Sequence, residues 1–117
     1  RIRAYCSVYL DLDSSYSIWG YGNIGRQCFH LLNSAGIKVS SIYDSNIRGK
    51  QEKNIPVLYP HEALLLQKTS KILISTTKYQ NEIQKKLEAL GLEQGKDYYI
   101  FAELVHKICC GYYSQNR

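Results

Sequence analysis

The strongest constraint on the fold is a run of glycines that follows a β-like segment and opens a helical one. Residues 20–25 read Gly-Tyr-Gly-Asn-Ile-Gly, and the segment Tyr16–Trp19 leads directly into them. Glycine permits a tight turn out of a strand and lets another group approach the backbone closely. It also lets the following helix pack against the sheet. The junction therefore predicts a helix seated directly on the end of a strand.

The rest of the chain alternates β-like and helical patterns, which is typical of a parallel sheet covered by helices. The predicted strands are Tyr16–Trp19, Lys38–Tyr43, Ile55–Leu58, Lys71–Ser75 and Asp97–Phe101. The predicted helices are Asn23–Ala35, Pro60–Lys68, a helix capped by Thr76 or Thr77 and closed by Gly91, and Ala102–Cys110. The polar stretch Ser45–Asn54 is predicted to be a loop.

These elements predict one α/β domain. We expect a three-layer, Rossmann-like arrangement with a parallel sheet of about five strands in the order 3-2-1-4-5. A chain of 117 residues is long enough for one compact core. We expect the domain to span residues 15–110, with residues 1–14 as an N-terminal arm or linker and residues 111–117 as a C-terminal tail.

An acidic residue stands where a dinucleotide-binding fold needs one. Asp44 ends the second predicted strand, about 20 residues after the last glycine of the turn. The amides of the first helical turn can bind a diphosphate, and Asp44 can accept hydrogen bonds from ribose hydroxyls. Its charge disfavours a 2′-phosphate, although Arg48 in the next loop would weaken that preference. NAD or a nucleoside diphosphate is therefore the expected ligand, rather than NADP.

Ten residues are the candidates for binding this ligand. They are Gly20, Tyr21, Gly22, Asn23, Ile24, Gly25, Asp44, Ser45, Thr76 and Thr77. The rings of Trp19 and Tyr21 flank the first glycine and are candidates for stacking on a base or sugar, with core packing the favoured role for Trp19. Three alternatives stay open: a turn without a ligand, an Asp44 that caps only its own loop, and threonines that cap only a helix.

No complete catalytic set is found in the sequence. No tyrosine is followed four residues later by the lysine that short-chain dehydrogenases use for proton transfer. His30, His61 and His106 belong to no nucleophile–base pattern. Cys109 and Cys110 with His106 form the only cluster suited to a metal, and idle or buried thiols are the favoured interpretation. We therefore predict a domain without catalytic residues or a metal of its own.

Charge and hydropathy limit the classes of partner that we expect. The net charge of +5 is spread along the chain rather than massed on one segment, so nucleic acid is not an expected partner. No apolar run approaches the roughly 20 residues of a transmembrane helix, and no signal peptide is recognisable. We expect a cytoplasmic protein without a membrane partner.

Four segments resemble one group of bacterial Rossmann-like domains. They are Ile18–Arg26, Ile42–Asn46 with its Asp-Ser-Asn step, Asn54–Val57 with its Ile-Pro-Val, and Pro60–Leu64. The group comprises nucleotide-binding domains attached to sugar acyltransferases, nucleotide-sugar dehydratases or epimerases, and sugar C-methyltransferases. The resemblance covers about Ser17–Phe101, most of the chain.

The resemblance implies a module that binds a nucleotide-sugar or NAD for polysaccharide biosynthesis while the reaction occurs elsewhere. It implies an attached catalytic domain or a homo-oligomer as partner. Gly20, Gly22 and Gly25 match the phosphate-binding turn and Asp44 the acid that contacts the nucleoside, whereas Tyr21 stands where the group often has alanine. Two alternatives remain: a fragment of an NAD-dependent oxidoreductase or epimerase lacking its substrate domain, and a ligand-free interaction or oligomerisation domain.

Overall fold

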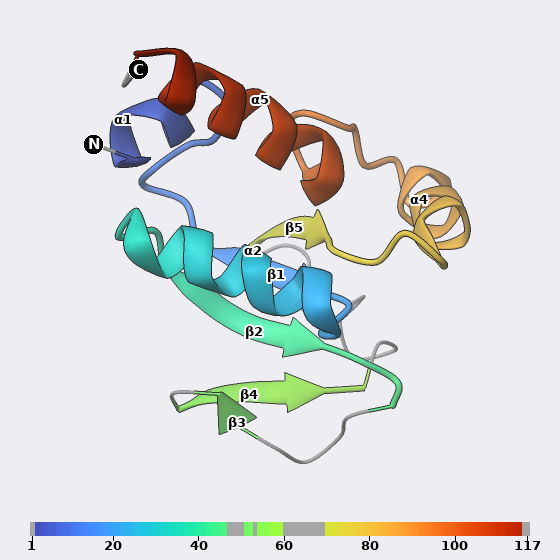
Figure 1. The fold of residues 1–117 in the computed structure, drawn as a ribbon. Helices are drawn as coiled ribbons and strands as arrows, with labels where there is room; N and C mark the ends of the chain where they lie inside the picture. Colours follow the sequence, from blue (N-terminus) through green and yellow to red (C-terminus); the bar gives the residue numbers. More distant parts are fainter. Residues whose placement is uncertain (1, 47–50, 53, 60–69, 116–117) are drawn as a thin grey trace.

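The chain folds into a twisted parallel sheet with helices on both faces (Figure 1). The computed structural model describes residues 2–46, 51–52, 54–59 and 70–115. The parallel strands are β1 (Tyr16–Trp19), β2 (Val39–Tyr43), β4 (Ile55–Leu58), β5 (Lys71–Ile74) and β6 (Tyr98–Ile100). They lie in the order β4-β2-β1-β5-β6, which confirms the predicted order and the Rossmann-like fold.

The described helices are α1 (Ile2–Cys6), α2 (Asn23–Ser34), α4 (Gln80–Ala89) and α5 (Phe101–Gln115). Apart from α1, which lies in the segment expected to be an arm or linker, they differ from the expected ones mainly at their ends. Helix α5 is longer than the predicted Ala102–Cys110 and continues past Gly111. The predicted helix Pro60–Lys68, with His61, lies outside the described residues, as does Arg48. None of the described helices is long and apolar enough to cross a membrane.

Alternating side chains along the strands build two separate cores. On one face Ile18, Leu73 and Tyr99 pack with buried residues of α2 and α5. On the other face Trp19 and Ile74 belong to a cluster completed by Ile83 and Leu87 of α4. Because successive strand residues point to opposite faces, each strand contributes to both cores. The sheet is therefore covered on both sides, as a parallel sheet requires.

The predicted loop Ser45–Asn54 contains a short strand, so the prediction of a loop was wrong there. Strand β3 (Gln51–Glu52) pairs antiparallel with β4 at the edge of the sheet. Asn54 stands between the two strands with a φ of 70°. Asparagine tolerates this left-handed conformation better than most residues, which permits the reversal. A two-residue polar strand has no hydrophobic alternation, so the sequence pattern could not reveal it.

The N-terminal segment packs against the body of the domain. Cys6 and Leu10 are buried in the core beneath α2 and α5. The guanidinium of Arg3 donates to the carbonyl oxygens of Ala35 (2.7 Å) and Gly36 (3.0 Å). A cation at this position satisfies carbonyls that the last turn of α2 leaves without helical partners. Helix α1 is thus attached to both the core and the C-terminal end of α2.

Buried serines connect three strands at the amino end of the sheet. The Ser17 hydroxyl oxygen of β1 lies 2.8 Å from that of Ser41 in β2 and 2.6 Å from that of Ser70, which precedes β5. Ser41 in turn donates to the Tyr43 hydroxyl at 3.1 Å. Ser17 and Ser41 are 1% and 5% exposed, so these groups depend on one another rather than on water.

Removing the central hydroxyl should destabilise the fold. Ser17→Ala deletes both hydrogen bonds and leaves neighbouring buried hydroxyls with fewer partners, at a cost of about 2 kcal/mol. Ser34→Ala, at an exposed helix position, should change the free energy of unfolding by less than about 0.5 kcal/mol. Urea denaturation of the two variants measures the difference. Equal stabilities would show that the serine network contributes nothing.

A buried thiol should make stability depend on alkaline pH. Burial raises the Cys28 pKa from 9.0 to about 12, although a hydrogen bond with Ser75 lowers it in part. Above about pH 9 the unfolded chain loses this proton while the folded chain keeps it, so stability is complete below that pH and falls above it. Denaturation at increasing pH should show a decline that is shallower in Cys28→Ala, by up to about 1.4 kcal/mol per pH unit. Identical slopes would contradict this assignment.

Candidate functional site

The candidate site lies where the carboxyl ends of three neighbouring strands meet. Gly20 follows β1 and donates its N–H to the Tyr43 carbonyl at the end of β2, at 2.8 Å. On the other side the Ser75 N–H donates to the Trp19 carbonyl, also at 2.8 Å. Helix α2 leaves this edge over one face and α4 over the other. Such a switch point is where open α/β sheets bind their ligands.

Gly20 is required by both conformation and space. Its φ of 103° lies in the region that side-chain-bearing residues rarely adopt. A Cβ at this position would also lie 3.0 Å from the Ser75 carbonyl oxygen and 3.0 Å from the Thr76 Cβ. The turn is therefore pressed against the residues that follow β5, and Thr76 borders the glycine turn.

Gly25 allows α2 to sit directly on that turn. A Cβ on Gly25 would lie 2.0 Å from the Gly20 carbonyl oxygen and 3.2 Å from the Tyr21 ring. No side chain can occupy such a space, so the first turn of α2 approaches β1 only because this residue is glycine. The expected role of Gly25 in close helix packing agrees with this geometry.

Gly22 differs from the other two glycines. It is the N-cap of α2, and a Cβ there would have no atom of the described structure within 4 Å. Its φ of −85° is also open to ordinary residues. Nothing inside the described chain therefore explains a glycine at this position, and the open space in front of it is accessible to an external group.

The amides of the first helical turn point to the same space without internal partners. The first helical hydrogen bond runs from the Arg26 N–H to the Gly22 carbonyl, at 3.0 Å. Within the described residues, no acceptor binds the N–H groups of residues 22–25, and Gly22 supplies no side-chain cap. The first turn also contains no acidic residue that would neutralise the helix dipole. Helix N-termini with these features are suited to anions.

Asp44 is turned toward the glycine turn. Its Oδ2 accepts the Tyr21 N–H at 2.7 Å, and its Oδ1 accepts the Asn46 N–H at 2.8 Å. The half-buried carboxylate thus caps its own loop and also accepts a hydrogen bond from the glycine turn. It does more than in the alternative in which Asp44 caps only its own loop. Each oxygen keeps further acceptor capacity for a hydroxyl donor. The Tyr21 amide is occupied by Asp44, so the amides left for an anion begin at Gly22.

The aromatic rings beside the turn lie in the core. Tyr21 is 4% exposed and meets Phe29 edge to face, with ring centroids 6.4 Å apart. Trp19 is 6% exposed and packs against Tyr43. The core packing favoured for Trp19 is confirmed, and Tyr21, a candidate for stacking on a base or sugar, is buried in the other core as well. The Tyr21 ring therefore packs against α2 through Phe29.

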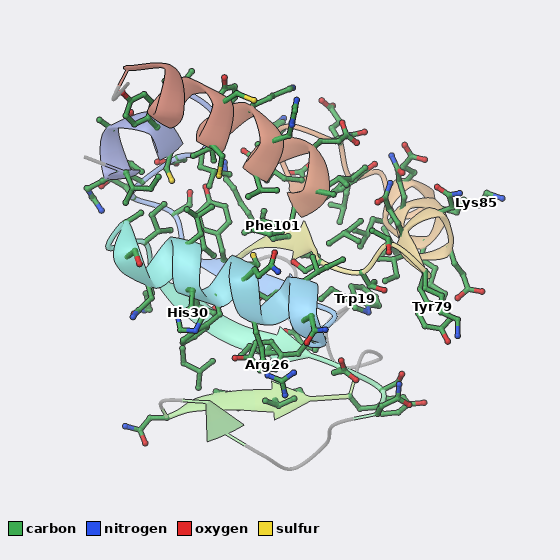
Figure 2. All side chains as sticks on the ribbon, in the orientation of Figure 1. Trp19, Arg26, His30, Tyr79, Lys85 and Phe101 are labelled. Carbon is green, nitrogen blue, oxygen red and sulfur yellow. The ribbon has the colours of Figure 1, made fainter. Side chains whose placement is uncertain are left out.

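Arg26 is a neighbour of the turn that the sequence analysis did not select. It extends from α2 (Figure 2), is exposed, and holds its guanidinium 5.3 Å from the centroid of the Tyr21 ring. A cation over an aromatic face is held in place by that contact. A basic residue directly after the third glycine was the available signal, and it adds positive charge next to the amides.

The remaining candidates lie around this edge in different environments. Asn23 and Ser45 are exposed, whereas Ile24 is half-buried and packs against the core cluster. The prediction that Thr76 or Thr77 caps the next helix was wrong. Helix α4 begins only at Gln80, after Tyr79, which forms no side-chain cap. Both threonines belong to the loop after β5, because the chain first turns away from the sheet edge before the helix starts.

The described residues offer little for catalysis at this site. They contain no group of three or more His, Cys, Asp and Glu side chains able to hold a metal ion. Cys28 is a buried residue of α2, and burial raises its pKa, so its side chain stays a thiol. His30 and His106 are exposed, and His106 contacts Cys110, with Nε2 3.8 Å from the sulfur. Beside the glycine turn, the part of the chain that the structure describes presents backbone amides and the Asp44 carboxylate.

No protein-family model matches the sequence, and no curated protein is significantly similar to it.

An added methyl group should destabilise the fold strongly at Gly25 and only slightly at Gly22. Gly25→Ala forces the helix away from the Gly20 carbonyl and should cost about 3 kcal/mol or more. Gly22→Ala meets no atom and should change the free energy of unfolding by less than about 1 kcal/mol. Thermal and urea unfolding measure both. Equal destabilisation would mean that Gly22 also serves internal packing.

Proposed function

We propose that the domain binds a nucleotide through its diphosphate and ribose, and that it serves as a nucleotide-sugar or NAD module without catalytic residues of its own. The amides of residues 22–25 hold the diphosphate, and Asp44 accepts hydrogen bonds from the ribose hydroxyls. The observation that carries the proposal is a combination at Gly22: among the described residues, the amides that begin there have no acceptor and the space in front of it holds no atom.

The charge distribution supports an anionic ligand. The helix dipole places partial positive charge at the N-terminus of α2, and Arg26 adds a full charge one turn into the helix. Asp44 stands to the side of the amides, fixed by two backbone N–H groups. A ligand with negative phosphates and neutral hydroxyl donors fits both ends of this arrangement, whereas a phosphate next to Asp44 would be repelled.

The biological setting follows from the resemblance of the motifs. Domains with a similar glycine turn and Asp-Ser-Asn step are attached to bacterial sugar-modifying enzymes. We therefore place the module in the cytoplasm, in polysaccharide biosynthesis, with the reaction carried out by an attached catalytic domain or a partner. A fragment of an oxidoreductase would bind NAD by the same residues, and an interaction domain would leave them empty.

Thermal-shift measurements with NAD, NADP and UDP-sugars test the proposal. A bound nucleotide at a hundred times its Kd should stabilise the protein by about 2.7 kcal/mol, a shift of several degrees. Gly22→Val should fold normally and lose the shift, because its side chain fills the space in front of the amides. Asp44→Asn should bind more weakly and discriminate less against NADP.

A matched control lies on the same helix. Asn33→Ala changes an exposed residue at the opposite end of α2 and should keep the full shift. A nucleotide that stabilises the wild type, Gly22→Val and Asp44→Asn equally binds elsewhere. A protein that responds to none of the nucleotides supports the interaction domain instead.

A further inference from the structure

A second feature lies away from the glycine turn, where the two ends of the chain meet. Helices α1 and α5 lie side by side, with both termini at this end of the molecule (Figure 1). A Cβ on Gly111 would lie 3.4 Å from the Tyr5 ring, so the helices are in direct contact. Lys107 of α5 also holds its ammonium group 5.9 Å from the Tyr9 ring centroid. Residues Tyr5 and Tyr9 therefore lie alongside Gly111 and Lys107 of α5.

Two thiols belong to this contact. Cys6 ends α1, is 0% exposed, and shares a hydrophobic cluster with Ile108 of α5. Cys109 follows Ile108 and is half-buried, one helical turn after Val105, which packs on the same cluster. Burial raises the Cys6 pKa, and the neighbouring Cys109 sulfur raises it further. Its place one turn after Val105 puts Cys109 on the side of α5 that borders the cluster containing Cys6.

We propose that Cys6 and Cys109 form a disulfide when the protein meets a small-molecule disulfide, and that this bond reversibly ties α1 to α5. Both cysteines are free in the present structure. The proposal concerns the attachment of the N-terminal helix and is independent of nucleotide binding.

The exchange proceeds in two balanced steps. The more accessible Cys109 reacts first: its thiolate attacks one sulfur of oxidised glutathione, forms a mixed disulfide and releases one reduced glutathione. The Cys6 thiolate then attacks the Cys109 sulfur and displaces the second glutathione. The protein loses two hydrogen atoms, that is two protons and two electrons, which reduce the glutathione disulfide to two thiols. A reductant such as dithiothreitol reverses both steps.

The bond would connect residues close to the two ends of the described chain. A cross-link that closes so long a loop restricts the unfolded state strongly, so the oxidised protein should unfold at a higher temperature. The two helices are already in contact, as the Tyr5 ring beside Gly111 shows. Reduction would leave α1 held only by packing and by the hydrogen bonds of Arg3.

Cys110 provides the matched control. It is adjacent to Cys109 in sequence but exposed, and its sulfur contacts His106 rather than α1. Neighbouring helical residues point about 100° apart, so the two thiols cannot both face Cys6. Cys28 is buried on α2 and is not accessible to the reagent.

The test is oxidation of the chain by glutathione disulfide, followed by intact-mass analysis and peptide mapping. The wild type and Cys110→Ser should yield a peptide that links Cys6 to Cys109 and should unfold at a higher temperature until dithiothreitol is added. Cys110→Ser, which lacks the exposed thiol, should lose two hydrogen atoms in intact mass. Cys109→Ser and Cys6→Ser should form no such link. In Cys6→Ser the glutathione adduct on Cys109 should persist.

Three outcomes would overturn the proposal. One is a wild-type protein that retains glutathione on Cys109 although Cys6 is present. Another is a link that joins Cys110 to any partner in place of Cys109, including a second molecule. The last is an oxidised protein that contains the Cys6–Cys109 link but has an unchanged unfolding temperature, because the bond would then not secure α1. Nucleotide binding is measured separately, so its failure would not be mistaken for any of these.

Discussion

The contact between the Gly25 backbone and the Gly20 carbonyl determines how this domain is assembled at its functional edge. Because no side chain separates them, the first turn of α2 lies directly on the end of β1. This seating fixes the direction of α2, and with it the direction of the amides that the helix leaves without internal partners. The same contact brings Cys28 and Phe29 onto the sheet, where they join the core. The packing of α2 and the placement of its N-terminal amides thus depend on one missing side chain.

Asp44 joins the next strand to that junction. Its carboxylate bridges the Tyr21 amide of the turn and the Asn46 amide of its own loop, so the ends of β1 and β2 are held together by a charged hydrogen-bond acceptor. Asp44 accepts the Tyr21 N–H, the first of these amides. Among the described residues, no acceptor binds the N–H groups that follow it in the turn. A residue expected to meet a ligand therefore also has a structural task, and substitutions at Asp44 must be judged for both.

The two faces of the sheet are covered by different helices and bury different kinds of side chain. One face carries α1, α2 and α5 on an almost wholly apolar core that reaches from Cys6 to Phe101. The other carries α4 on a smaller cluster, and its strands also bury a chain of hydroxyl groups around Ser17. Hydroxyls that satisfy one another are compatible with burial, whereas an isolated one would be costly. The chain ends meet on the apolar face, which places two thiols in one contact.

Much of the architecture was determined by local sequence pattern. The strands Tyr16–Trp19 and Ile55–Leu58 have the predicted bounds, and α2 ends one residue before the predicted end. The strand order was also predicted, because the glycine turn and the alternation of strands and helices are typical of a Rossmann-like sheet. The positions of the three turn glycines and of Asp44 at the sheet edge follow from the same pattern. Local periodicity and turn chemistry are sufficient for these features.

Tertiary structure decided the features that depend on distant partners. Strand β3 exists through its pairing with β4, and α1 is held by α5 and by the end of α2. The start of α4 at Gln80, rather than at the threonines, reflects the path the chain takes from the sheet edge. Which glycine serves packing and which leaves open space could be learned only from the neighbouring atoms. A sequence specifies local conformational preference, whereas contacts between remote segments arise only when the chain has folded.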